Sequence, residues 1–125
     1  GDRQYAEQGI GILSKVVQNG WANYSTNTNI AFLYEQIGQY DEALKILQNL
    51  LASDPSNYNT YKRLAFLEAD IQNSRDNEER SYDAFLEYYN KAKELYAAIN
   101  NGNDLEMQLL DLMYQDAEAG GWIQE

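Results

Sequence analysis

An internal repeat with a period of 34 residues constrains this chain more than any other feature. Residues 23–33 read NYSTNTNIAFL and residues 57–67 read NYNTYKRLAFL, so six of the eleven aligned positions are identical. A fixed period of this length arises when one small structural unit is stacked on copies of itself, because a single unit cannot bury its own apolar face. The repeat therefore predicts at least two tandem copies of one supersecondary unit.

Apolar residues follow a helical spacing in each copy. Ile30, Leu33, Tyr34 and Ile37 lie at i, i+3, i+4 and i+7, which places them on one face of a helix with 3.6 residues per turn. Pro55 ends the next such segment, because proline disfavours helix at the residue before it. No segment shows a sustained period of two, so no strand is expected. The expected helices cover residues 5–19, 26–37, 40–54, 61–71, 82–96 and 105–119.

Several residues around the first copy belong to a known signature. Gly38-Gln39-Tyr40-Asp41-Glu42-Ala43-Leu44 follows the first helix, and Asp54-Pro55 closes the second. The segment resembles the tetratricopeptide repeat (TPR) family, whose small, aromatic, turn and helix-ending positions match Ala31, Tyr34, Gly38, Tyr40, Ala43, Leu50 and Pro55. This resemblance implies an all-α, right-handed solenoid of about six antiparallel helices: half a repeat, two full repeats and half a repeat. We expect one TPR-like domain over residues 1–125, as a piece of a larger protein.

The second copy departs from this pattern in two ways. Tyr82-Asp83-x-x-Leu86 matches Tyr40-Asp41-x-x-Leu44 at a spacing of 42, which implies eight inserted residues within the polar run 72–81. Phe85 also stands where the first copy has Ala43. A ring cannot fill a gap the size of a methyl group, so the helices there are expected to move apart.

The composition excludes several classes of function. The chain has nine Lys and Arg against twenty Asp and Glu, a net charge of −11, and neither His nor Cys. An acidic chain repels nucleic acid and anionic membranes, and the missing residue types are the commonest general base, nucleophile and zinc ligands. Gly9-Ile10-Gly11 lacks the rest of a phosphate loop, and the oxygen-rich run 100–106 does not fit an EF-hand. We therefore expect a non-catalytic protein without a cofactor or a metal. No stretch approaches the roughly 18 apolar residues of a membrane-spanning helix, so no such segment is expected. The missing cysteines do not fix the compartment, and the expected location is cytoplasmic.

The candidate binding residues lie on the first helix of each copy but off its apolar stripe. At about 100° per residue, Phe32 lies roughly 200° from Ile30, and Phe66 has the same relation to Leu64. Because the family presents its first helices along a concave groove, the proposed groove residues are Asn29, Phe32, Gln36, Lys62, Arg63, Phe66 and Asp70. Two alternatives stay open: each Phe packs beneath another part of the chain, and the basic pair Lys62-Arg63 is neutralised by Asp70, Glu35 or other acids.

The sequence leaves three functions in competition. The first is an interaction module that binds a peptide or a protein surface in the groove. The second rests on a looser resemblance of residues 61–70, 77–82 and 120–122 to the C-terminal TPR segments of bacterial serine/threonine protein kinases, and implies a regulatory or scaffolding domain. The third is self-association into a homodimer through the terminal half-repeats. The acidic C-terminal helix, which has no basic residue from Asp104 onward, either attracts a basic partner or is a solvated face.

Overall fold

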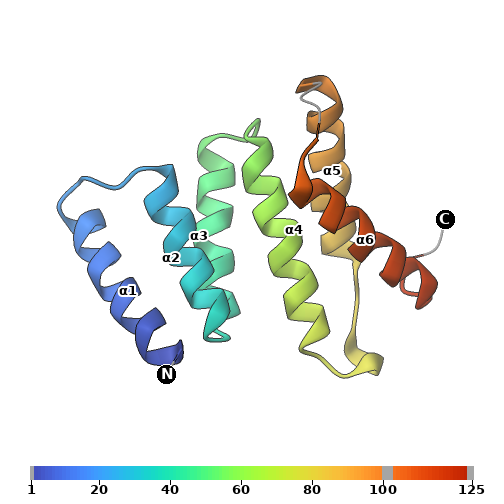
Figure 1. The fold of residues 1–125 in the computed structure, drawn as a ribbon, viewed down its shortest axis with the longest axis horizontal. Coiled ribbons are helices and arrows are strands. Elements are labelled where there is room, and N and C mark those ends of the chain that lie inside the picture. The colour runs from blue at the N-terminus through green and yellow to red at the C-terminus, as the bar shows by residue number, and fades with distance from the viewer. Residues whose placement is uncertain (1, 100–102, 124–125) are drawn as a thin grey trace. The chain divides into compact units, whose positions relative to one another are not determined.

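The computed structural model describes residues 2–99 and 103–123 and is helical, with no strand in those two ranges. Its α-helices are α1 (Asp2–Gln18), α2 (Tyr24–Gln36), α3 (Tyr40–Ser53), α4 (Tyr58–Asn73), α5 (Asp83–Ile99) and α6 (Leu105–Ala119) (Figure 1). A 3₁₀ helix (Asn77–Glu79) lies between α4 and α5. The prediction of an all-α fold with six helices is confirmed, and α6 has the predicted ends.

The chain forms two compact units, which we call unit 1 (residues 1–55) and unit 2 (residues 56–125). The prediction of one domain over residues 1–125 stays a prediction. In unit 1, α2 packs against both α1 and α3 (Figure 1). A Cβ atom built on Gly9 of α1 would lie 2.8 Å from Leu33 Cδ1 of α2, so glycine permits the close approach of these two helices. Gly9 is thus a packing residue, and the buried apolar residues of unit 1 are Ala6, Ile30, Ala31, Ala43 and Leu47.

The repeated asparagines begin the first helix of each copy. Asn23 accepts a hydrogen bond from Thr26 N through Oδ1 (2.9 Å), and Thr26 Oγ1 accepts one from Asn23 N (3.2 Å), which is a capping box. Asn57 caps α4 by accepting a hydrogen bond from Asn59 N (3.0 Å). The identical Asn-Tyr pair of the two copies is therefore a helix start signal, since an asparagine side chain satisfies backbone donors that the helix leaves unpaired.

In unit 2, α4 packs against α5 and α6, and α5 also contacts α6. Phe85 is only 1% exposed, and its ring stacks on Tyr89 with 5.7 Å between centroids. Tyr89 in turn stacks on Tyr114 of α6 at 5.0 Å. Phe85, which stands where the first copy has a small residue, thus packs in a stack of three aromatic rings. Whether it moves the helices apart stays a prediction.

The inserted run is folded back onto unit 2 by Arg80. Its Nε donates to Arg75 O (3.1 Å) and its Nη2 donates to Asn73 O (3.2 Å), so the loop after α4 is tied to the last turn of that helix. The guanidinium carbon lies 5.3 Å from the Trp122 ring centroid, which joins the insertion to the segment after α6. The insertion is therefore an ordered loop with one 3₁₀ turn.

Candidate interaction site

The candidate residues on α2 are open to solvent. Phe32 is 49% exposed, and Asn29 and Gln36 are exposed as well. Ile30 and Ala31 of the same helix are buried, so α2 has one face in the core and Phe32 on another. The alternative in which Phe32 packs fully beneath its own chain is wrong.

The candidate residues on α4 are in a different situation, because α6 covers part of them. The Lys62 side chain is only 7% exposed, and its Nζ lies 2.8 Å from Asp104 Oδ2 and 2.9 Å from Glu106 Oε1. Arg63 forms an ion pair with the second oxygen of Glu106. The basic pair is thus neutralised within unit 2, by two acids at the start of α6. In this arrangement Lys62 is not open to a ligand.

Asp104 is the centre of this network. Its Oδ1 accepts hydrogen bonds from Glu106 N (2.9 Å) and Met107 N (3.2 Å), so it caps α6. Its Oδ2 accepts hydrogen bonds from Lys62 Nζ and from the Tyr58 hydroxyl. Burial alone would raise the pKa of Asp104, but the hydrogen bonds from Lys62, Tyr58 and Met107 N hold it below the ordinary value. Burial and the bond to Asp104 raise the pKa of Tyr58.

Three α4 candidates remain partly open. The Arg63 side chain is 35% exposed, and Phe66 and Asp70 are half-buried. The guanidinium carbon of Arg63 lies 5.8 Å from the Phe66 ring centroid, a cation–π contact. Arg63 therefore bridges Glu106 and Phe66, and the accessible part of this face is an arginine resting on an aromatic ring.

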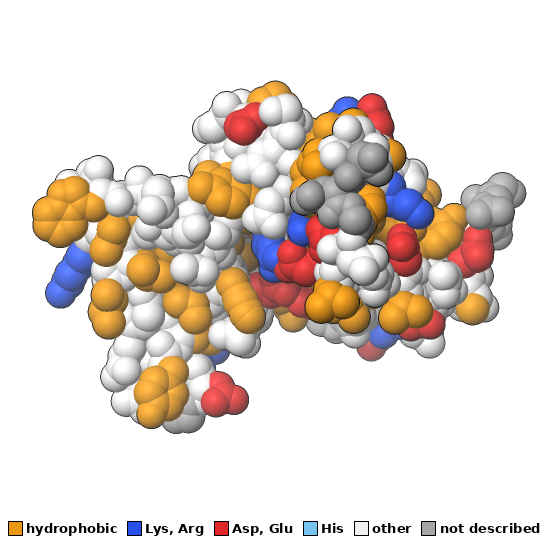
Figure 2. All heavy atoms as spheres, turned by 45° about the horizontal axis from the view of Figure 1, so that its top comes forward, with side chains coloured by type: hydrophobic (Ala, Val, Ile, Leu, Met, Phe, Trp, Pro, Cys, Tyr) orange, Lys and Arg blue, Asp and Glu red, His pale blue; other side chains and the backbone are white. Residues whose placement is uncertain are grey.

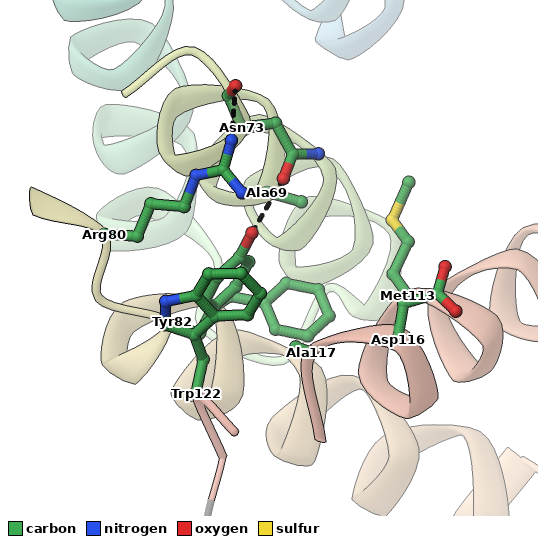
Figure 3. A pocket seen from close by; sticks show the side chains of 9 residues that line it. Ala69, Asn73, Arg80, Tyr82, Met113, Asp116, Ala117 and Trp122 are labelled. Atoms are coloured by element: carbon green, nitrogen blue, oxygen red, sulfur yellow. Dashed lines mark hydrogen bonds between the residues drawn. The ribbon is translucent and has the colours of Figure 1, made fainter. Parts of the chain in front are cut away.

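Unit 2 also has a pocket of about 220 Å³ that sequence analysis did not anticipate (Figure 3). Its aromatic side is formed by Trp122 and Tyr82, whose ring centroids are 5.5 Å apart, and by Phe85. Asn73 lies across from them and accepts a hydrogen bond from the Tyr82 hydroxyl (2.7 Å), while Asp116 and Met113 form another side (Figure 3). Only the fold brings the insertion and the C-terminal segment together, so no local pattern could reveal this pocket.

A metal site and a membrane span both lack support in the described part of the chain. Among residues 2–99 and 103–123, no three His, Cys, Asp or Glu side chains are grouped so that they could hold an ion. Of the oxygen-rich run, residues 100–102 lie outside the described residues, while Asp104 and Glu106 pair with Lys62. None of the described helices has the length and apolar character that crossing a bilayer requires.

Comparison with known proteins identifies one segment. A family model for the tetratricopeptide repeat matches residues 28–67, which run from the first turns of α2 through α3 into α4. Neither the curated proteins nor the solved structures gave a match. The matched segment contains the packing residues Ala31, Ala43 and Leu47, all of them buried, and the Gly38 turn with φ of +77°. The chain therefore contains a tetratricopeptide repeat, which spans residues 28–67.

Proposed function

We propose that this chain is a non-catalytic interaction module that binds peptides or protein surfaces, through exposed side chains of α2 in unit 1 and, separately, of α4 in unit 2. Tetratricopeptide repeats typically serve as protein-interaction modules. The observation that carries the proposal is the position of Phe32, which is half-exposed on a helix whose opposite side is buried. Large aromatic side chains that are exposed on a helix surface are typical of binding hot spots.

Each helix would contribute in its own way. On α2, Phe32 supplies apolar area, and the amides of Asn29 and Gln36 supply donors and acceptors for a peptide backbone. On α4, Arg63 and Phe66 supply a stacked cation and ring, and Asp70 a carboxylate beside them. Lys62 acts indirectly, because its bonds to α6 keep Glu106 next to Arg63. With a net charge of −11, the chain attracts partners with basic residues.

The test is a peptide selection on the full chain, followed by binding measurements on variants. Peptides enriched from a random display library are labelled, and their affinity is measured by fluorescence anisotropy. Phe32→Asp is expected to weaken binding by tenfold or more, since hot-spot truncations cost about 2 kcal/mol or more. Tyr5→Asp is the matched control, because Tyr5 is an exposed aromatic residue of α1 in the same unit.

On α4 the informative change is Phe66→Glu, paired with Arg63→Ala. Alanine is preferable to glutamate at residue 63, because a new carboxylate would repel Glu106 and disturb α6. Both variants are expected to lose the selected peptides that bind α4, while keeping the helical circular dichroism. Unchanged affinity in the α2 and α4 variants together would move the binding site to another surface and refute the proposal.

Two other functions are separated from this one by simple measurements. If the chain is a regulatory domain of a bacterial serine/threonine protein kinase, the full coding sequence carries kinase motifs outside these residues. If the terminal half-repeats drive homodimerisation, sedimentation gives a mass that rises with concentration. A monomer encoded without a kinase domain would leave peptide or protein binding as the function.

A further inference from the structure

Helix α6 carries a row of three exposed leucines, which we call the leucine row: Leu105, Leu109 and Leu112. They lie at i, i+4 and i+7, within an arc of about 60° on the helix surface. Their exposed fractions are 74%, 51% and 57%. The buried residues of the helix, Met107, Leu110 and Ala117, lie on roughly the opposite side. Hydrophobic side chains reach the surface as separate patches in the view of Figure 2. The three leucines are aligned along a single helix.

The core of unit 2 does not require these leucines. Leu110 is fully buried, and the Tyr89 hydroxyl donates to Asp111 Oδ1 (2.6 Å), so α6 is held by its other side. Its first turn is fixed by the Asp104 cap and the Lys62 ion pairs. A helix held in this way presents the leucine row with little further ordering cost, which favours binding. Aligned exposed apolar residues on a stable helix are typical of an interaction surface.

Charge decides what kind of partner fits. Unit 2 has six Lys and Arg against fourteen Asp and Glu, and α6 has no basic residue. Asp116 is exposed one turn beyond Leu112, in line with the leucine row. A second copy would bring a like-charged surface against this one, which is unfavourable. A helix with aliphatic residues on one side and Lys or Arg beside them would satisfy both the apolar area and the acidic surroundings.

We propose that the leucine row docks a basic amphipathic helix of a partner protein. Such a helix lies against α6 with its apolar side chains on the three leucines, and a lysine or arginine near the end of the contact meets Asp116. This surface does not include Phe32, Phe66 or any other residue of the peptide-binding proposal, so the two fail or succeed separately.

The probes are three synthetic peptides of 18 residues, tested on the full chain by fluorescence anisotropy. The first has leucines at i, i+4, i+7 and i+11, with lysine and arginine at most other positions. The second has the same composition with the leucines scattered around the helix, and the third has glutamate in place of the basic residues. We expect the first peptide to bind at least tenfold more tightly than the other two, and its affinity to fall as salt is added. Equal binding of the glutamate peptide would overturn the proposal.

The matched variants place the contact on α6. The double variant Leu109→Gln, Leu112→Gln is expected to bind the first peptide at least tenfold more weakly. Burying one leucine side chain at an interface contributes enough free energy for about a tenfold change in affinity. Tyr5→Gln with Ile12→Gln is the control, since these α1 residues are 76% and 65% exposed, and it should change affinity less than twofold. All four side chains are exposed, and circular dichroism verifies that both variants stay folded.

Two results would contradict the assignment. If the α6 and α1 variants lose affinity equally, the peptide does not use the leucine row. If sedimentation shows a dimer that disappears in the α6 variant, the occupant is a second copy and the proposed partner is wrong. If the α6 variant loses affinity for the first peptide and Phe32→Asp keeps it, the result supports a docking surface that is separate from the peptide-binding site.

Discussion

The Asp104 network allows a quantitative test of how α6 is attached to α4. Asp104→Asn removes the negative charge but keeps the helix cap, because asparagine is as good as aspartate at an N-cap position. What is lost is the charge-assisted hydrogen bond from Lys62 Nζ (2.8 Å) and the bond from the Tyr58 hydroxyl. Lys62 keeps Glu106 at 2.9 Å, so its ammonium group is not left alone.

The magnitude follows from burial and bond type. The side chains of Lys62 and Asp104 are 7% and 17% exposed, so solvent screens the pair only slightly. Hydrogen bonds to charged groups contribute about 1.5–3 kcal/mol, and the remaining Glu106 contact offsets part of the loss. We expect Asp104→Asn to lower the free energy of unfolding by about 2 kcal/mol. Asp104→Ala should lower it by about 3 kcal/mol, since the cap contributes about 1 kcal/mol more.

The pH dependence has a defined sign. The folded-state pKa of Asp104 lies below its ordinary value of 3.8, so the carboxylate stabilises the folded state above that pH. The stabilisation is lost as the pH falls below 3.8 and through the folded-state pKa. The difference between wild type and Asp104→Asn is therefore expected to be full at pH 7 and to shrink under strongly acidic conditions.

The assay is urea unfolding at several pH values, read by the fluorescence of Trp122 in a Trp21→Phe background. Trp21 is exposed and its removal leaves Trp122, which packs against Tyr82 in unit 2, as the reporter. If Asp104→Asn is as stable as wild type at pH 7, the network contributes no net stability. A loss that does not change with pH would show that the charge is not its origin.

Two further predictions concern packing and alkaline pH. Ala43→Leu is expected to destabilise the chain by about 1–3 kcal/mol, because Ala43 is fully buried and a larger side chain overpacks its site. Thermal unfolding followed by circular dichroism measures this change. An unchanged midpoint would mean that the core of unit 1 has room for the added atoms. Burial and the hydrogen bond to Asp111 raise the folded-state pKa of Tyr89 above its ordinary value of 10.0. The associated stability is complete below pH 10.0 and is lost as the pH rises above it, so urea titrations should show falling stability there, with a smaller fall in Tyr89→Phe.

Local patterns were sufficient to predict the helices. Leu105 to Ala119 was predicted to the residue because Asp104 and Gly120-Gly121 are start and stop signals. Helix α2 begins two residues before its predicted start, since the capping function of Asn23 was not recognised in the repeated Asn-Tyr pair. Signals of this kind act over a few residues, so the sequence alone contains them.

The candidate site was predicted less completely. The helical angle placed Phe32 off the apolar stripe of its helix, but it left open whether the ring is exposed, as it is, or packs beneath another part of the chain. The burial and ion pairing of Lys62 depend on Asp104 and Glu106, which are 42 and 44 residues away in the sequence. These acids come near Lys62 only when α6 packs on α4. The pocket beside Trp122 depends on two distant segments in the same way. Contacts of this kind follow from packing and from the length of the insertion, which no local pattern encodes.

Because Arg80 closes the inserted loop, this loop of unit 2 is a suitable place to insert additional residues. Because its guanidinium holds the carbonyls of Asn73 and Arg75, the two ends of the loop stay in place whatever lies between Asp76 and Glu79. Those intervening residues are exposed, and lengthening a loop whose ends are already fixed costs little conformational entropy. An epitope tag or a small fluorescent reporter could be inserted at this point, which is part of neither binding surface, without altering the start of α5.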